Sequence, residues 1–423
     1  MKIKKATLID FLLLVVIKIL LEISYTFYVG KLYGYYGFVS SLSIYKLVES
    51  YLAFIVVFMF LPKSEKNVSS IVMRFLFLVM IIPMQSFYAL ADEARAFFYL
   101  FNISFLLTII VCALMPKCSI KKIKHSNRLL IFVLVVLSLV TYILLIRSNG
   151  LPSLLAFNLS KVYQIRSSII YNPRILMYFV FWQVKVINPF LIGIFFTKKQ
   201  YKRLLLVMFM QLFIFLLTGH KSILFSPILV LTVIHVIKKE KIMLTLVSKL
   251  LILGIGVSLI VFLMNISEWP ANLLIRRVLF VPALNYFHYY DFFSHNEYLY
   301  LAEGQIGKLF SLTSPYSIPI VNLIGKIYYN NVNTSANTGY LGDAYANFGW
   351  YGMLIYSVVL GLLLKVFDTF ASKSELTIAV AVIIIPMFSL IESALLTTIL
   401  SNGLIMSMIF IYLYKNKDVG FNS

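Results

Sequence analysis

The sequence predicts an all-α polytopic membrane protein with about twelve transmembrane helices and a large outer loop before the tenth. The first observation is composition: the 423 residues are 61% hydrophobic and 13% charged, with a mean hydropathy of +0.93. A soluble domain needs more polar surface than that. The second is the recurrence of apolar runs of roughly 18 to 23 residues, long enough to cross a hydrocarbon core of about 30 Å. The third is a series of short basic segments after alternate runs.

The predicted spans follow the apolar runs in order. Each run is expected to be a helix, because a backbone in lipid must satisfy its own polar groups. The first run lacks a small-residue cleavage site and is followed by another run, so we expect a retained helix and not a signal peptide. The predicted ranges are 8–29, 40–62, 71–91, 96–115, 128–146, 175–196, 204–218, 222–237, 249–267, 346–366, 376–393 and 396–414.

The formal net charge of +21 is distributed as in a membrane protein, which argues against a nucleic-acid partner. Most Lys and Arg residues lie in "MKIKK", "PKSEKN", "PKCSIKKIKHSNR", "TKKQYKR", "VIKKEK", "ASKSE" and "YKNKD". The positive-inside rule places these segments and both termini in the cytoplasm. Cys112 and Cys118 have no neighbouring His and carboxylate ligands to complete a zinc shell, so no metal site or disulfide is expected there.

Residues 1–423 are predicted to form a single integral membrane domain with two long outer loops. The first loop covers 147–174, and the second, a folded cap, covers 268–345. Both are rich in aromatic and aliphatic residues, which argues against disorder, and loops of this length are usually functional. The cap stretch "IRRVLFVPALNYFHYYDFFSHNEYLYL" has apolar residues at helical spacing and suits a helix along the membrane surface. We find no internal repeat, which disfavours a transporter.

Basic residues on the outer side are few and collect in the two long loops and in the turn "TGHKS". The rigid fork of arginine matches phosphate oxygens, and such contacts are strong where water is partly excluded. A polyprenyl diphosphate is the anion expected at an outer membrane surface. The alternative for each residue is pairing with a lipid phosphate or a nearby carboxylate. The predicted diphosphate site consists of Arg166, Arg174, His220, Lys221, Arg276 and Arg277.

Charged residues inside the predicted spans are costly and are functional hypotheses by default. They are Asp10, Lys18, Glu22, Lys46, Glu49, Lys185 and Glu392. Lys18 with Glu22 and Lys46 with Glu49 have spacings that permit pairing within one helix, so a structural role is preferred for these four. A proton-coupled transporter would use the same residues, and that alternative stays open.

The stretch "TGYLGDAYANFGWYG" stands where the polar end of the cap turns into an apolar span. Gly342, Gly349 and Gly352 fall close together on a helical wheel and predict a flat strip that a helix or a ligand can approach. Asp343 lies beside that strip at the expected membrane edge.

The longer string "GYLGDAYANFGWYGMLIYSVVLGLLL" resembles a segment of bacterial oligosaccharide repeat-unit polymerases, the Wzy-type O-antigen and capsule polymerases, where it opens the span after the large periplasmic loop. "TGHKSILFSPIL" and "IRRVLFVPALNYFHYYDFF" are similar to two further family segments. The resemblance implies a fold like that of the GT-C-like glycosyltransferases with lipid-linked donors, in the bacterial inner membrane. It also implies that the loops with Arg166 and Arg174 and with Arg276 and Arg277 hold donor and acceptor.

The reaction that this resemblance implies joins two undecaprenyl-diphosphate-linked glycans at the periplasmic face, without metal or cofactor. Basic side chains would stabilise the charge that develops on the departing diphosphate. A base for the acceptor hydroxyl is expected among Asp343, His288 and Asp291, the last two sharing a face if "NYFHYYDFF" is helical. The aromatic residues expected to offer flat faces to sugar rings are Trp269, Tyr289, Tyr290, Tyr298 and Tyr340.

Two other functions stay open from the sequence. An O-antigen ligase would use the same donor and a similar outer loop. A flippase for the lipid-linked repeat unit would have about twelve spans and buried charges, but it does not predict a folded outer cap. The expected partners are the lipid bilayer and the lipid-linked glycans, with a chain-length regulator, flippase and ligase of the same pathway.

Overall fold

The computed structural model describes residues 5–116, 120, 123–124, 126–152, 162–238 and 243–415, and all regular structure in these ranges is helical. Cys118 lies outside them, and Cys112 is buried and forms no disulfide within the described residues. The helices up to the middle of the chain are α1 (Lys5–Ser24), η1 (Tyr25–Val29), α2 (Gly30–Leu32), η2 (Gly34–Tyr36), α3 (Ile44–Phe60), α4 (Val68–Leu76), η3 (Phe77–Ile81), α5 (Ile82–Leu90), α6 (Arg95–Leu114), α7 (Ser126–Asn149), α8 (Val162–Ser168), α9 (Leu176–Trp182), η5 (Gln183–Ile187) and α10 (Asn188–Thr197).

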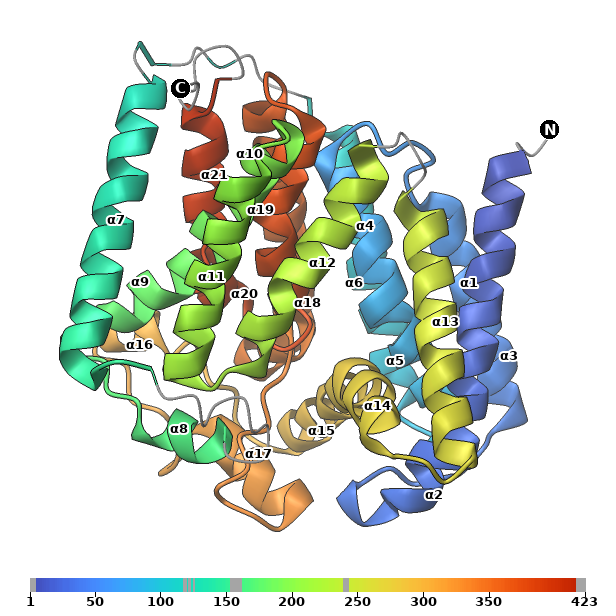
Figure 1. Cartoon of the computed structure of the whole chain (residues 1–423). Helices are drawn as coiled ribbons and strands as arrows, with labels where there is room; N and C mark the ends of the chain where they lie inside the picture. Colours follow the sequence, from blue (N-terminus) through green and yellow to red (C-terminus); the bar gives the residue numbers. More distant parts are fainter. Residues whose placement is uncertain are drawn as a thin grey trace.

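The remaining helices are α11 (Tyr201–Thr218), α12 (Lys221–Lys238), α13 (Met243–Leu263), α14 (Trp269–Ala271), η6 (Asn272–Phe280), α15 (Val281–His295), α16 (Gln305–Leu309), α17 (Ile320–Tyr329), α18 (Tyr340–Ala371), α19 (Leu376–Ser389), α20 (Leu395–Leu400) and α21 (Leu404–Leu413). The long helices run side by side, with the start of α1 and the end of α21 at the same end of the bundle (Figure 1). The short helices α8, α16 and α17 lie at the opposite end, named the cap face below.

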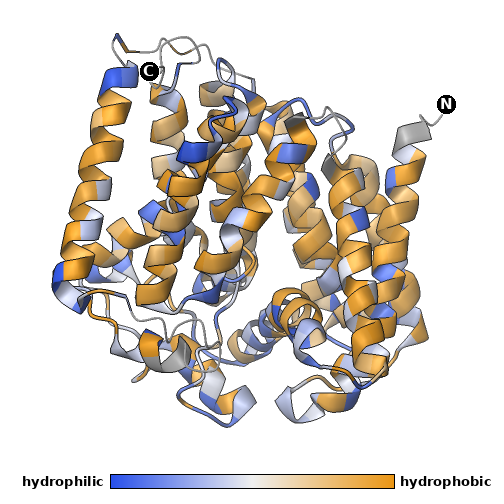
Figure 2. Cartoon of the chain, in the orientation of Figure 1, coloured by the Kyte–Doolittle hydropathy of each residue, from blue (hydrophilic) through white to orange (hydrophobic). Residues whose placement is uncertain are grey.

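Eight helices are long and apolar enough to cross a membrane. They are Val68–Leu90, Arg95–Leu114, Ser126–Asn149, Leu176–Thr197, Tyr201–Thr218, Leu244–Leu263, Tyr340–Ala371 and Leu395–Leu413. Lys221–Ile237 and Leu376–Ser389 are apolar but shorter. Figure 2 shows the apolar colouring along these helices and the polar segments gathered towards their ends. The chain is therefore a polytopic α-helical membrane protein, as predicted, while the number of twelve spans stays a prediction.

The helix chain Val68–Leu90 forms the centre of one side of the bundle and is buried along its whole length. Burial on every side is typical of a helix surrounded by protein. Two of its buried polar side chains have side-chain partners: Gln85 Nε2 donates to Asn102 Oδ1 at 2.7 Å, and Arg74 Nη1 lies 3.0 Å from Glu65 Oε1. Such pairing is what an interior without water requires.

Three π-helical segments, η3, η5 and η6, end directly before a helix whose second residue is proline: Pro83, Pro189 and Pro282. Proline has no N–H to donate and its ring clashes with the carbonyl four residues back, so a wider turn relieves the backbone. Segment η5 contains Lys185, and η6 contains Arg276 and Arg277. The wider turns therefore help to set the directions of these three charged side chains.

The stretch that follows the cap starts α18 earlier than predicted, at Tyr340, and then breaks the helix at Phe348 and Gly349. Gly349 has φ +57° and ψ −138°, and a Cβ there would lie 2.6 Å from the hydroxyl of Tyr298. Because the helix turns here, Gly342, Gly349 and Gly352 do not form the predicted strip. The break instead frees the carbonyl of Ala346, which accepts a hydrogen bond from Leu299 N at 2.9 Å.

The cap packs onto the bundle through its longest helix. The segment α14–η6–α15 lies across the long helices (Figure 1) and contacts α13 at its start and α18 further along. Its transverse direction agrees with the helix predicted along the membrane surface. Because α18 starts at Tyr340, the last six residues of the predicted loop 268–345 are helical. The cap thereby brings residues of α15 and of the following segment against the first turns of α18.

Candidate functional site

Lys185 is a buried cation whose ammonium is held from two sides. Its Nζ donates to Asn402 Oδ1 at 2.6 Å and to Ser389 Oγ at 3.2 Å, and lies 5.3 Å from the ring centre of Phe181. Ser389 is the last residue of α19, and Asn402 lies in the turn before α21. The two contacts therefore join η5 to the C-terminal helices. A charge placed this deep with a defined orientation suits an anion-binding role.

Glu392 lies near Lys185 in the turn between α19 and α20 and opens into a cavity. The surrounding protein strips water from its carboxyl and raises its pKa, while the positive charges of Lys185 and Arg277 lower it. Arg277 itself is an exposed residue of η6. The turn therefore receives positive charge from two separate parts of the chain.

His220 is influenced by the same cations, since Lys185 acts on it together with Arg166. It follows Gly219, which closes α11 in the left-handed conformation at φ +64°, as the predicted turn requires. Burial lowers the pKa of His220 to about 4, and the positive charges of Arg166 and Lys185 add to that effect. At neutral pH the imidazole is therefore uncharged and offers one N–H donor. Nearby, the hydroxyl of Tyr171 is buried without a hydrogen-bond partner within the described residues.

Lys185 and Arg277 act on Glu392, and Arg166 and Lys185 act on His220; these three basic residues and the uncharged His220 are named the cationic group below. Three of them were predicted as diphosphate ligands from sequence. Lys185 was expected only as a buried charge of open function.

The other predicted diphosphate ligands are placed differently. Arg276 is buried: its guanidinium carbon lies 4.4 Å from the ring centre of Tyr33 and its Nε donates to Asn272 Oδ1 at 3.0 Å. It joins the cap to the segment after α1 and does not belong to the cationic group. Arg174 is exposed in the turn before α9, and Lys221 is the first residue of α12, directly after His220.

A cavity of about 420 Å³ adjoins the cationic group at Glu392. Its walls come from α9, α15, the segment that connects α15 to α17, the start of α18 and the α19–α20 turn with α20. Three carboxylates line it: Glu303, Asp343 and Glu392. No lysine, arginine or histidine in the described part of the chain is among its lining residues. The lining therefore contains carboxylates, while Lys185 and Arg277, which act on Glu392, are not part of it.

Asp343 lies on the first turn of α18 and is the predicted base that lines this cavity. Asn347 Nδ2 donates to Asp343 Oδ1 at 3.2 Å and to its main-chain carbonyl at 2.8 Å. The side-chain oxygen of Asn347, Oδ1, accepts from Leu301 N at 2.8 Å. Asn347 is thereby fixed by the cap segment, and it orients one oxygen of the Asp343 carboxylate.

Glu303 forms part of the opposite wall and caps α17, accepting from Ile320 N at 2.9 Å through Oε1 and 3.1 Å through Oε2. Burial raises the pKa of Glu303, and the hydrogen bond from Ile320 opposes that rise. The capping contact explains why a carboxylate is stable at this half-buried position.

His288 and Asp291, the alternative predicted bases, lie away from this cavity. The ring of His288 stacks on Tyr328 with a centroid distance of 4.2 Å, and Tyr328 donates its hydroxyl proton to Asp291 Oδ2 at 2.5 Å. Burial lowers the pKa of His288 to about 4. The pair thus holds α17 against α15, a contact that gives it a packing role.

The aromatic residues predicted to bind sugars also lie in different parts of the structure. Tyr289 lines the cavity, with its hydroxyl donating to the Ala336 carbonyl at 3.0 Å. Tyr298 lines a shallow groove of about 680 Å³ on the surface. Tyr290 stacks on Phe97 at 4.9 Å, Trp269 is 48% exposed at the start of α14, and Tyr340 is fully buried, so its ring has no accessible face.

Most residues that line the cavity were not predicted as site residues, and Tyr178, Glu303, Thr338 and Glu392 are among them. For Glu392 a signal existed, because a lone carboxylate interrupts a long apolar run. Threonine and tyrosine are common at helix ends, so the sequence does not mark Thr338 or Tyr178 as site residues. Only the fold places these two residues on the cavity wall.

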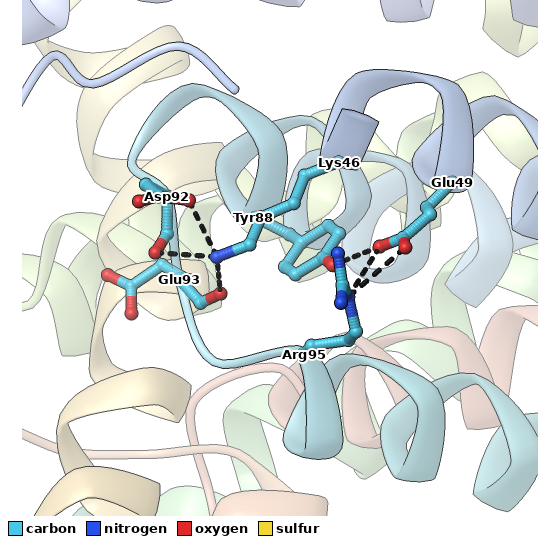
Figure 3. Close-up of polar contacts among 6 residues, drawn as sticks. All are labelled: Lys46, Glu49, Tyr88, Asp92, Glu93 and Arg95. Atoms are coloured by element: carbon cyan, nitrogen blue, oxygen red, sulfur yellow. Dashed lines mark hydrogen bonds and ion pairs between the residues drawn. The ribbon is translucent and has the colours of Figure 1, made fainter. Parts of the chain in front are cut away.

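Of the two ion pairs predicted within the first two spans, the structure contains one and lacks the other. Lys18 Nζ lies 3.0 Å from Glu22 Oε1, which confirms pairing within the helix. Lys46 instead reaches Asp92 Oδ1 at 2.7 Å, and Glu49 Oε1 lies 3.1 Å from Arg95 Nε (Figure 3). The predicted Lys46–Glu49 pair is therefore wrong.

The reason is that the turn between α5 and α6 offers stronger partners than the neighbouring helix turn does. Lys46 Nζ also donates to the carbonyls of Asp92 and Glu93, at 2.9 and 2.6 Å, while Glu49 accepts from the Tyr88 hydroxyl at 2.5 Å (Figure 3). Burial raises the pKa of Glu93 to about 7, with Asp291 and Asp92 adding to the rise and Lys46 opposing it. The network ties α3 to the α5–α6 turn.

Replacing Lys46 with methionine is expected to lower protein abundance and the unfolding temperature in detergent. The substitution removes one ion pair and two hydrogen bonds to carbonyls, and we expect a loss of about 1 kcal/mol, because the site is partly exposed. Thermal unfolding of the purified protein measures it. Lys63→Met, at an exposed position after α3, is the control. Equal unfolding temperatures for both variants would contradict a structural role for Lys46.

No group of three or more His, Cys, Asp or Glu side chains that could hold a metal ion occurs among the described residues. No known family model, curated protein or solved structure matches this chain. Its function therefore has to be inferred from its own residues.

Proposed function

We propose that the chain is a Wzy-type polymerase that transfers a glycan from one polyprenyl diphosphate carrier to a second carrier-linked glycan. The observation that carries the proposal is the meeting of the cationic group with the carboxylate-lined cavity at Glu392. A polytopic membrane protein with such a site fits an anionic donor that is anchored in lipid. The proposed location is the bacterial inner membrane, with the cap face on the periplasmic side.

The donor diphosphate binds at the cationic group in this proposal. Arg166 and Arg277 offer forked N–H donors, Lys185 adds a fixed positive charge, and neutral His220 donates one N–H. These groups are in place before the reaction, so they stabilise the negative charge that grows on the diphosphate as it departs. Hydrogen bonds to Ser389 and Asn402 hold the Lys185 ammonium in place.

The acceptor glycan enters the cavity with a sugar hydroxyl towards Asp343. The Asp343 carboxylate takes the hydroxyl proton as the oxygen forms a bond to the anomeric carbon of the donor sugar. The bond between that carbon and the diphosphate oxygen breaks, and its electron pair leaves with the diphosphate. Because both substrates are tethered to one membrane, their encounter costs less entropy than in solution.

A gel of surface lipopolysaccharide from a strain that lacks this gene tests the proposal. We expect a core that carries one repeat unit, because export and ligation still operate. The wild-type gene should restore the ladder of long chains. A bare core without any repeat unit would place the chain in ligation or flipping, and the polymerase proposal would then be abandoned.

A further inference from the structure

Gln211 is a buried residue of α11 whose side chain bonds to η5, α10 and α12. We infer that Gln211 is a positioning residue for the diphosphate site. Its amide serves two carbonyls for which Pro189 and Pro227 have no N–H to donate. It thereby ties the segment that carries Lys185 to the start of α12. The link to diphosphate binding rests on the proposed function, whereas the hydrogen bonds do not.

The first of these carbonyls belongs to Val184 in the π turn η5. In such a turn an N–H pairs with the carbonyl five residues back, as Asn188 N does with Gln183 O. The next donor in this register would come from position 189, which is proline. Gln211 Nε2 donates to Val184 O instead, at 3.2 Å. Because this carbonyl belongs to the peptide group that ends at Lys185 N, the contact fixes the plane from which the Lys185 residue departs.

The second carbonyl belongs to Ile223 in the first turn of α12. Its α-helical partner would be the N–H four residues on, at Pro227, which has none. Gln211 Nε2 donates to Ile223 O at 3.1 Å and to Ser226 Oγ at 3.0 Å. Ile223 N in turn donates to His220 O at 2.9 Å. Gln211 therefore holds α12 within one turn of the His220 position.

The other polar atoms of this network are paired as well. Gln211 Oε1 accepts from Asn188 Nδ2 at 2.6 Å, and Asn188 Oδ1 accepts from Gln183 Nε2 at 2.7 Å. Gln183 Oε1 accepts from Ser138 Oγ of α7 at 3.0 Å. Freed backbone groups inside a membrane must find partners in neighbouring helices, and a satisfied buried network favours one geometry. The network therefore fixes η5 relative to α11 and α12.

Lys185 is thus held from two directions. The network fixes its backbone from the side of α11, while Ser389 and Asn402 accept hydrogen bonds from its ammonium. Charges that stabilise a diphosphate act only if they are placed beforehand, and a small displacement weakens them strongly. Loss of the Gln211 donors should therefore disturb anion binding more than it disturbs a fold that rests on extensive apolar packing.

Binding of farnesyl diphosphate, a short prenyl diphosphate, to the full-length protein in lipid nanodiscs tests the inference. Gln211→Met retains the length of the side chain but has no N–H to donate, and we expect about tenfold weaker binding than in the wild type. Gln85→Met removes another fully buried amide, on α5, whose Nε2 donates to Asn102 Oδ1. It should lower the unfolding temperature to a similar extent and leave binding unchanged.

A double-mutant cycle with Lys185→Met separates positioning from general stability. If Gln211 acts through Lys185, its replacement matters little once the ammonium is gone, so the double variant should bind about as weakly as Lys185→Met alone. Additive losses in the double variant, wild-type affinity in Gln211→Met, or an equal loss in Gln85→Met would each overturn the inference. If Gln211→Met does not fold, Gln211→Asn carries the same test, because its amide is one methylene shorter.

The outcomes distinguish this inference from the proposed function. A wild-type protein that does not bind farnesyl diphosphate would lose the diphosphate site on which the proposed function rests, and the positioning role would fall with it. A wild type that binds, together with additive losses in the cycle, would retain that site and remove only the role of Gln211.

Discussion

Replacing Arg277 with alanine is expected to lower the rate of glycan transfer about 100-fold or more while the protein still inserts into the membrane. Arg277 is exposed on η6, and its positive charge acts on Glu392, which lines the cavity. A departing diphosphate gains negative charge in the transition state, so a guanidinium placed beforehand contributes more there than in the bound substrate. The transfer rate of purified protein and the length of surface glycan both measure the effect.

Two control variants sharpen this experiment. Arg277→Lys should restore little activity, because a lysine presents one donor point where arginine presents a planar fork. Lys308→Ala removes an exposed cation of α16 in the same cap and should leave the rate near that of the wild type. Wild-type transfer by Arg277→Ala would exclude Arg277 from diphosphate binding.

The adjacent arginine should behave differently, although the sequence predicted one role for both. Arg276 packs its guanidinium over Tyr33 at 4.4 Å and bonds to Asn272, so its removal opens a buried contact between the cap and the segment after α1. Stacking of this kind contributes to stability. We therefore expect Arg276 to stabilise the attachment of the cap to the bundle, and so to support protein abundance.

The fold class could be predicted because it depends on properties that are local in sequence. Apolar runs of membrane length and basic segments between them need no knowledge of which helices touch. The same locality explains the failure for Lys46. Spacing showed that Glu49 was within reach, but it could not show that the turn at Asp92 and Glu93 would offer a charge and two carbonyls.

Backbone irregularities limited the prediction in a second way. A helical wheel assumes one uniform turn, whereas Gly349 breaks α18 with a positive φ and the π turns widen η5 and η6. These features redirect Lys185 and Arg277 relative to an ideal helix. Their cause is only partly local: proline marks the π turns, but the break at Gly349 also depends on the hydroxyl of Tyr298.

The candidate site was predicted only in part, because residue type does not show which segments meet in the fold. Residue type and outer position singled out Arg166, His220 and Arg277. In the structure Arg277 acts on Glu392, and Arg166 acts with Lys185 on His220. Glu303 was missed, because it lies in an irregular segment of the cap where a carboxylate is unremarkable. Only the docking of that segment onto α18 turns it into a wall of the cavity.

Replacing Asp343 with asparagine is expected to lower the transfer rate by a factor of about 10² to 10⁴ without loss of the fold. An asparagine has the same size and retains an oxygen that accepts the hydrogen bond from Asn347, so the start of α18 keeps its contact with the cap. It cannot take a proton from the acceptor hydroxyl. Single-turnover transfer with purified protein and a polyprenyl-diphosphate-linked acceptor measures the rate, and thermal unfolding checks the fold.

Asp291→Asn provides the comparison, because Asp291 was an equally plausible base by residue type. The structure joins it to Tyr328 outside the cavity, so its substitution should change stability slightly and the transfer rate less than severalfold. If Asp291→Asn abolished transfer and Asp343→Asn did not, proton removal would belong to the side of α15 that carries His288. The acceptor would then have to bind on that side, and the cavity at Asp343 would lose its catalytic role.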